Sequence, residues 1–167
     1  MITDSAKSPA SGLPPHRLCL EITETALMDA EDDRQRGPTT LRTLADRGIG
    51  IAVDDFGTGY SNLARLRHLP AAALKIDASF VADLDTPEGD AFAESVITSL
   101  VALAHASGMT VTAEGVETAE QAHRLSGLGV DYAQGFHYSR PVAAEQVTAV
   151  LERLAESTAV PGDSGLG

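Results

Sequence analysis

The sequence predicts an α/β fold in which about five parallel strands alternate with helices. Two observations carry this prediction. Short apolar runs rich in Val, Ile and Leu, typical of strands buried on both faces, alternate with stretches whose apolar residues recur at helical spacing. Each apolar run also ends at an acidic or amide residue, and parallel (β/α) barrels carry their functional side chains at the carboxyl ends of their strands.

The predicted elements alternate along the whole chain. Strands are predicted over residues 18–23, 49–56, 73–77, 110–116 and 131–135. Helices are predicted before Gly48 and Gly108, which are typical helix stops, then over 119–125, and finally over 147–154 after Pro141. A complete barrel needs eight strands and about 250 residues. With 167 residues, the chain is expected to form either an open five-stranded sheet or a partial barrel whose first three βα units are missing.

The composition indicates one folded domain with an acidic surface. Hydrophobic residues make up 43% of the chain and aromatic residues 4%, which is enough for a single core of aliphatic side chains. The 24 acidic residues outnumber the 12 basic ones. This balance argues against binding to a nucleic-acid polymer or a membrane surface, because both attract positive charge. A phosphate-containing ligand would need metal ions to offset the repulsion.

The chain carries no sign of export. Cys19 is the only cysteine, so no internal disulfide can form, which fits a reducing compartment. The first residues lack the apolar core of a signal peptide, and no apolar run approaches the roughly 18 residues of a membrane span. We therefore expect a cytoplasmic protein with an unstructured N-terminus over residues 1–12, one folded domain over 13–156 and a disordered tail over 157–167.

Carboxylates at the predicted strand ends are candidate metal ligands. The hard oxygen atoms that Mg²⁺ and Mn²⁺ prefer are offered by Glu21, Asp54, Asp55 and Glu114. No Cys/His cluster suggests a different metal. Two divalent ions about 4 Å apart can deprotonate water and neutralise phosphate oxygens during displacement at phosphorus. This set of residues is therefore suited to hydrolysis of a phosphate ester.

Structural roles compete with these assignments. On an extended backbone the adjacent Asp54 and Asp55 point in different directions, so one could be a buried cap and the other a solvated acid. Asp77, expected on the same strand face as Lys75, is either a supporting site residue or a helix cap. Glu117 is either a support for the site or a first-turn acid of the following helix.

Five separate motifs occur in the order LEITET, DDFGTGYSNL, LKIDASFV, AEGVET and QGFHYSRP. Together they resemble the EAL family of cyclic di-GMP phosphodiesterases, and the similarity extends from Leu13 to about Leu154. The resemblance implies a TIM-like (β/α) barrel that uses two Mg²⁺ or Mn²⁺ ions to hydrolyse one phosphodiester of cyclic di-GMP, giving linear pGpG. The family's first three strands carry the Glu of its Glu-Ala-Leu signature and a metal-binding Asn, which have no counterpart here.

The resemblance also implies roles for individual residues. Glu21 would bind the first metal ion and Asp54 would bridge both. Asp55 and Glu114 would hold the second ion, and Glu114 would also assist water deprotonation. Lys75 would orient the attacking water or a phosphate oxygen. The remaining implied roles are catalytic support from Glu117 and Gln134, a supporting role for Asp77, and tethering by Glu24 of the loop that begins at Gly57. Gln134 could instead cap the last strand.

Three functions remain open at this stage. The first is metal-dependent phosphodiesterase chemistry, with this chain a truncated form that is inactive on its own. The second is a catalytically silent EAL relative that acts as a binding or dimerisation module. The third is another carboxylate-based barrel enzyme such as a glycosidase, against which the absence of tryptophan counts. The expected partners are cyclic di-GMP, a second copy of the chain, and a sensory or diguanylate cyclase domain.

Overall fold

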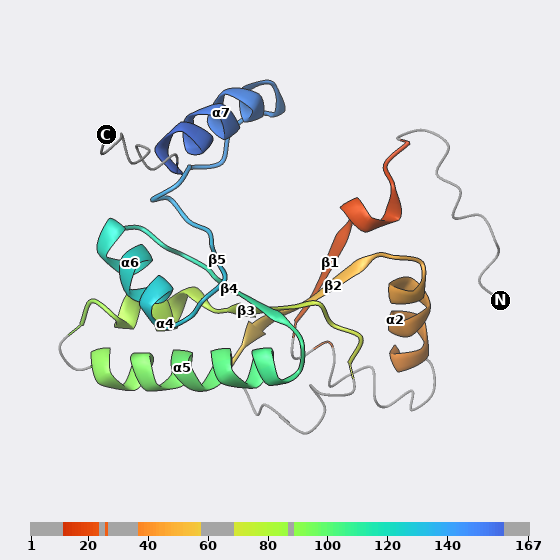
Figure 1. Cartoon of the computed structure of the whole chain (residues 1–167), viewed down its shortest axis with the longest axis horizontal. Helices are drawn as coiled ribbons and strands as arrows, with labels where there is room; N and C mark the ends of the chain where they lie inside the picture. Colours follow the sequence, from red (N-terminus) through yellow and green to blue (C-terminus); the bar gives the residue numbers. More distant parts are fainter. Residues whose placement is uncertain (1–11, 24–25, 27–36, 58–68, 87–88, 159–167) are drawn as a thin grey trace, which may run out of the picture.

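The computed structural model describes residues 12–23, 26, 37–57, 69–86 and 89–158. Within these ranges the chain forms one five-stranded parallel sheet whose spatial order follows the sequence (Figure 1). The strands are β1 (Cys19–Thr23), β2 (Gly50–Phe56), β3 (Ala73–Ile76), β4 (Thr110–Ala113) and β5 (Tyr132–Ala133). The predicted α/β fold of five parallel strands with flanking helices is confirmed.

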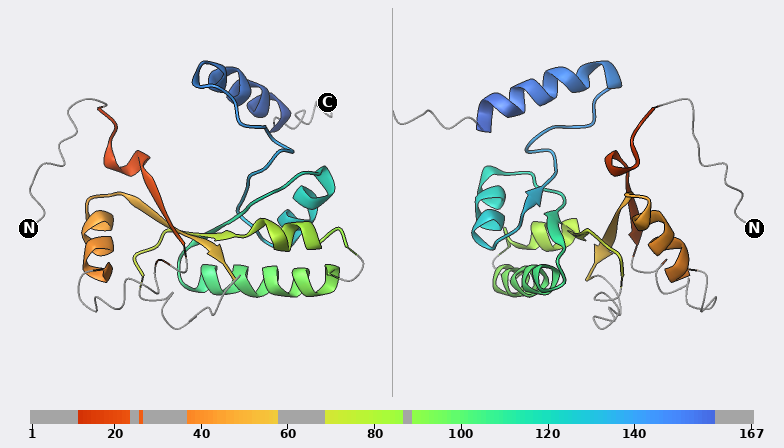
Figure 2. Two further views of the ribbon diagram at one scale, coloured as in Figure 1. Left: turned by 180° about the vertical axis from the view of Figure 1, so that it is seen from behind. Right: turned by 45° about the vertical axis from the view of Figure 1, so that its right-hand side comes forward.

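Helices connect and flank the strands. They are α2 (Gly37–Asp46), α4 (Ala78–Asp83), α5 (Asp90–Ala106), α6 (Ala119–Gly127) and α7 (Val147–Thr158), with short 3₁₀ turns η1 (Pro15–Arg17) and η2 (Ala144–Gln146). The long α5 packs along β3 and β4, whereas α7 is set apart from the sheet in every view (Figures 1 and 2). Because α7 continues to Thr158, the tail predicted from residue 157 begins within a helix.

The core lies between the central strands and α5. Side chains of β3 and β4, including Leu74, Ile76 and Val111, are completely buried, as expected for strands covered on both faces. Five residues of α5 at helical spacing pack against them: Ala93, Ile97, Leu100, Val101 and Ala104. Phe92, in the first turn of α5, points away from this core and is 65% exposed.

The first two strands end where the sequence predicts, at Thr23 and Phe56, whereas the last three end earlier than predicted. β4 stops at Ala113 and β5 at Ala133, so the acidic and amide residues that follow them lie in loops. These loops remain paired, because the backbone N–H of Val116 donates to the carbonyl of Gln134 at 3.1 Å. The shorter strands therefore leave Glu114 and Gln134 in two connected loops at the carboxyl rim of the sheet.

Asp131 joins three elements at the opposite end of the sheet. Its Oδ2 accepts a hydrogen bond from the backbone N–H of Val111 at 2.7 Å and lies 2.8 Å from Nε2 of His105, in the last turn of α5. The hydrogen bonds from His105 and Val111 lower the pKa of the Asp131 carboxyl below its ordinary value. Asp131 thus ties α5 and β4 to the start of β5.

No helix in the described part of the chain has both the length and the apolar character needed to cross a membrane.

We expect Asp131→Ala to lower the free energy of unfolding by about 1–3 kcal/mol at neutral pH, because the buried N–H of Val111 loses its acceptor. The folded-state pKa of Asp131 lies below its ordinary value, so its contribution to stability is complete above the ordinary pKa and is lost as pH falls through the folded-state pKa. Urea unfolding of wild type and variant, from neutral pH down through the folded-state pKa of Asp131, measures the difference in the free energy of unfolding. His105→Ala keeps the hydrogen bond between Val111 and Asp131, so it should lower the free energy of unfolding by less. An equal loss in both variants would assign the stabilisation to the contact between His105 and Asp131.

Candidate active site

The ammonium of Lys75 lies at the centre of the carboxyl rim of the sheet. Lys75 is 6% exposed, and its Nζ contacts Glu21 Oε2 at 2.9 Å, Asp54 Oδ1 at 3.1 Å and, closer still, Glu114 Oε1. The parallel register places Thr23 beside Asp54 and Ile76 beside Ala113. Acids from β1, β2 and the loop after β4 therefore converge on a lysine of β3.

The surrounding carboxylates keep this lysine charged. Burial alone would lower the pKa of Lys75, because a buried ammonium loses hydration. The hydrogen bonds with Glu114, Glu21 and Asp54 overcome that effect and raise the pKa above its ordinary value. The rim therefore carries a fixed positive charge among three acids at neutral pH.

An unusual backbone conformation brings Asp54 and Asp55 together. The ladder between β2 and β3 is irregular between Val53 and Phe56, and Asp55 has a φ of 55°. Aspartate is among the non-glycine residues that tolerate this left-handed region best, and the N–H of Asp55 donates to Asp54 Oδ1 at 3.1 Å. The adjacent acids consequently do not diverge as they would on a regular strand.

Three carboxylates meet closely enough to share a cation. One oxygen from each of Asp54, Asp55 and Glu114 lies within 4.8 Å of the other two. Such a set consists only of hard oxygen donors, which suits Mg²⁺ or Mn²⁺. Glu21 does not belong to this group, but it contacts the same Lys75 ammonium, and its side chain is half exposed. The structure thus brings all four sequence-predicted metal ligands to one place.

Gln134 is directed at Glu114. Its Nε2 donates to Glu114 Oε1 at 2.9 Å, and the following Gly135 packs against the loop after β4. A Cβ at Gly135 would lie 2.2 Å from the carbonyl oxygen of Val116, so this contact requires glycine. Gln134 therefore contacts the site, in addition to supporting the loop through its backbone carbonyl.

The loop that carries Glu114 and Glu117 is fixed by a buried glutamine. Gln121 in α6 is 4% exposed, and its Oε1 accepts hydrogen bonds from the N–H of Glu117 at 2.7 Å and of Thr118 at 3.1 Å. Its Nε2 donates to Asp85 Oδ2 at 2.8 Å. Gln121 is not among the site residues predicted from the sequence, although the spacing of Thr118 and Gln121 is that of a capping box.

Three further residues predicted from the sequence are Glu117, Asp77 and Glu24. The Glu117 side chain is exposed and lines a pocket beside Glu114. Asp77 is the N-cap of α4, where its Oδ1 accepts from the N–H of Ser79 at 2.9 Å; the hydrogen bonds from Ser79 lower its pKa. The helix-cap alternative is therefore the role observed for Asp77. Glu24 lies outside the described residues.

Comparison with known proteins places this rim in a family. Residues 4–141 match the family model described as the EAL domain. This chain belongs to the EAL family. EAL domains have TIM-like barrel folds, and the family explains why acids at the carboxyl ends of successive strands converge. The resemblance found in the sequence motifs is confirmed.

The EAL chain is similar to parts of larger proteins. It is 43% identical over 138 residues to the bifunctional diguanylate cyclase/cyclic di-GMP phosphodiesterase MucR of Pseudomonas aeruginosa, covering 82% of this chain and 19% of MucR. A structure of PaMucR phosphodiesterase in complex with c-di-GMP matches with a TM-score of 0.71 and 41% identity, covering 81% of this chain and 52% of that one. This EAL chain therefore spans about a fifth of the full length of MucR.

A third similarity concerns an EAL relative with bound ions. Klebsiella pneumoniae BlrP1, solved in complexes of cyclic di-GMP with manganese or with calcium, matches with a TM-score of 0.68 and 34% identity. The match covers 80% of this chain and 32% of BlrP1.

We expect Gly115→Ala to destabilise this EAL domain by about 1–3 kcal/mol, because strain and overpacking act together. Gly115 has a φ of 71°, and an added Cβ would lie 2.5 Å from the Cβ of Ala78. Thermal unfolding measures the change. Gly127→Ala in α6 is the matched control, because nothing lies within 4 Å of its added Cβ; it should be neutral or slightly stabilising. Equal effects of the two substitutions would contradict the close packing of the Glu114 loop.

Proposed function

We propose that this chain carries metal-binding and catalytic residues of a cyclic di-GMP phosphodiesterase site that produces linear pGpG. The observation that carries the proposal is the approach of Asp54, Asp55 and Glu114 within 4.8 Å beside the buried Lys75. The similarity to MucR and to a phosphodiesterase in complex with c-di-GMP supports the substrate. MucR is bifunctional, which supports a partnering cyclase domain. A cytoplasmic location, expected from the single cysteine, belongs to the same proposal.

The residues fit divalent cations. The ammonium of Lys75 already lies among three carboxylates, which indicates that this rim favours positive charge. We assign Glu21 to a first Mg²⁺ or Mn²⁺ ion, Asp54 to a bridge between two ions, and Asp55 with Glu114 to the second. When bound, two such ions would supply a deprotonated water and neutralise phosphate oxygens. The manganese complex of BlrP1 supports this assignment.

The chain's own residues would orient the reacting groups. Lys75 and Gln134 both engage Oε1 of Glu114, which leaves Oε2 as the oxygen that accepts a proton from water. The ammonium of Lys75 would hold the water or a phosphate oxygen, since its charge is maintained by its neighbours. The exposed Glu117 would support the same loop from the pocket side. A supporting role for Asp77 in the site, in addition to its helix cap, and tethering of a loop by Glu24 stay predictions.

We expect Mn²⁺ to raise the melting temperature of the chain, because ligands that bind the folded state stabilise it. Asp54→Ala should abolish the shift and any pGpG formation. Asp46→Ala, which removes an exposed acid of α2, is the charge-matched control and should respond to Mn²⁺ as wild type does. Differential scanning fluorimetry and chromatography of the nucleotide products measure both effects. An unchanged melting temperature of wild type in Mn²⁺ would overturn the metal site.

A second candidate function is a binding or dimerisation module without catalysis. It is favoured by the open sheet, since in the described ranges β1 pairs only with β2 and β5 only with β4. Unpaired strand edges tend to associate with other chains. Binding of cyclic di-GMP without formation of pGpG would select this candidate.

The same open edges lead us to expect self-association of the chain. Size-exclusion chromatography with light scattering over a range of concentrations should show an apparent mass that rises with concentration. A monomeric mass at all concentrations, together with cooperative unfolding, would contradict this expectation.

A further inference from the structure

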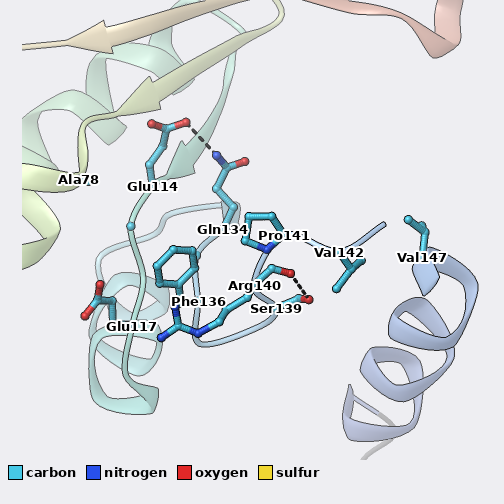
Figure 3. A pocket seen from close by; sticks show the side chains of 12 residues that line it. Ala78, Glu114, Glu117, Gln134, Phe136, Ser139, Arg140, Pro141, Val142 and Val147 are labelled. Carbon is cyan, nitrogen blue, oxygen red and sulfur yellow. Dashed lines mark hydrogen bonds between the residues drawn. The ribbon is translucent and has the colours of Figure 1, made fainter. Parts of the chain in front are cut away.

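The short stretch of chain between Glu114 and α6 is held at both ends. At its start, the N–H of Glu114 donates to the carbonyl of Ile76 at 3.1 Å, which ties this residue to β3. Figure 3 shows Glu114 and Glu117 along the stretch, with Gln134 directed at Glu114. Because only two residues separate Glu114 from Glu117, a shift at the Glu117 end would move the Glu114 carboxylate. The contacts that hold the Glu117 end therefore bear on the candidate metal site.

The side chain of Gln121 holds the Glu117 end. Its Oε1 accepts hydrogen bonds from the N–H of Glu117 at 2.7 Å and from the N–H of Thr118 at 3.1 Å. A capping box at the start of a helix requires only the second of these bonds. The additional, shorter bond goes to the stretch that leads back to Glu114. Gln121 therefore does more than begin α6.

Asp85 determines which way the amide of Gln121 faces. Nε2 of Gln121 donates to Asp85 Oδ2 at 2.8 Å and to the carbonyl of Val81 at 3.5 Å. A carboxylate and a carbonyl can only accept hydrogen bonds, so both require the NH₂ end of the amide. The oxygen end is consequently directed at the two N–H groups. Since Gln121 is only 4% exposed, water cannot easily replace a lost partner.

A second side chain of α6 also contacts the region between α4 and α5. The guanidinium of Arg124 donates to the carbonyl of Leu84 at 2.7 Å. It also forms ion pairs with Asp90 and Glu94 in α5. None of these contacts involves the stretch between Glu114 and α6. Arg124 therefore attaches α6 to its neighbours, whereas Gln121 both attaches the helix and holds the stretch before it.

We propose that Gln121 and Asp85 are positioning residues that set the affinity of the candidate metal site for a divalent cation. Gln121 holds the Glu117 end of the stretch, and Asp85 keeps the Gln121 amide in the orientation that this requires. Both act through Glu114, whose carboxylate must stay close to two other acids for a cation to be shared. Residues that orient a metal ligand commonly change metal affinity 10- to 100-fold. The inference rests on the proposed function, because it concerns the same metal site.

Exchange of donor and acceptor between the two side chains tests the inference. Gln121→Glu keeps an acceptor for the two N–H groups but places an oxygen against the Asp85 carboxylate, so it should weaken Mn²⁺ binding by about 10-fold. Asp85→Asn alone should have little effect, because an amide oxygen can still accept from Gln121. In the double variant the amide at position 85 can donate to the new carboxylate, and most of the Mn²⁺ affinity should return. Calorimetric titration of the metal-free chain with Mn²⁺ measures all four affinities.

Arg124→Met is the matched control on the same helix. It removes the contacts of α6 with Leu84, Asp90 and Glu94 and leaves the hydrogen bonds of Gln121 in place. The variant should melt at a lower temperature and bind Mn²⁺ as wild type does. Equal weakening of Mn²⁺ binding by Arg124→Met and Gln121→Glu would overturn the inference, because affinity would then follow the attachment of α6 in general.

Asp85→Ala tests the inference without altering the buried amide. The Asp85 side chain is exposed, so the variant should fold, and the Gln121 amide should lose the partner that orients it. Hydrogen exchange at the N–H groups of Glu117 and Thr118 should be faster than in wild type, and Mn²⁺ should bind more weakly. Unchanged Mn²⁺ affinity in this variant would overturn the inference, whatever the exchange rates.

Failure of the proposed function has a different signature. A wild-type chain that binds no Mn²⁺ would remove the metal site, and the inference with it. Wild-type Mn²⁺ binding that persists unchanged in Gln121→Glu and Asp85→Ala would overturn the positioning role alone, while the metal assignment stands.

Discussion

The charge of Lys75 allows acids from separate strands to share a small volume. Glu21, Asp54 and Glu114 would repel one another on a rim of a chain with a net charge of −12, and the buried ammonium contacts all three. Removing one member of such a buried group leaves uncompensated charge, which usually destabilises a protein more than the group itself stabilises it. Pairing of the parallel strands positions these residues, and the positive charge of Lys75 offsets the repulsion among the three carboxylates. The candidate metal site and the neighbouring pocket both depend on this arrangement.

Backbone constraints next to the acids give the rim its shape. Asp55 occupies the left-handed region beside an irregular ladder, and Gly115 and Gly135 let loops approach more closely than any side chain permits. Strained or glycine-dependent positions commonly cluster at functional sites, where surrounding structure holds them in place. Here that support comes from Gln121, whose amide links the loop after β4 to α6 and to Asp85. The strained positions lower the stability of the rim, and the contacts around them give Glu114 a defined position.

The sequence predicted the strands and the acids at their ends because hydrophobic runs and parallel topology are local or family-wide signals. The family resemblance predicted that Asp54 and Asp55 share one site, but the sequence does not reveal the backbone geometry that brings them together, because the ladder irregularity forms only when β2 pairs with β3. The exposure of Phe92 likewise depends on which face of α5 meets the sheet. Asp77 shows the opposite case. Aspartate is a favoured helix N-cap, and the side chain of Asp77 caps α4. The roles of the acids in metal binding and catalysis stay predictions.

The spatial order of the strands has an evolutionary consequence. Every strand pairs with the next one along the chain, so the distances among Lys75 and its acids are set by ladder hydrogen bonds between neighbours. A longer connection between two strands adds little entropic cost, about 0.6 kcal/mol for each doubling of loop length. Insertions in the connections can therefore accumulate, and acquire regulatory contacts, without displacing the residues on the rim.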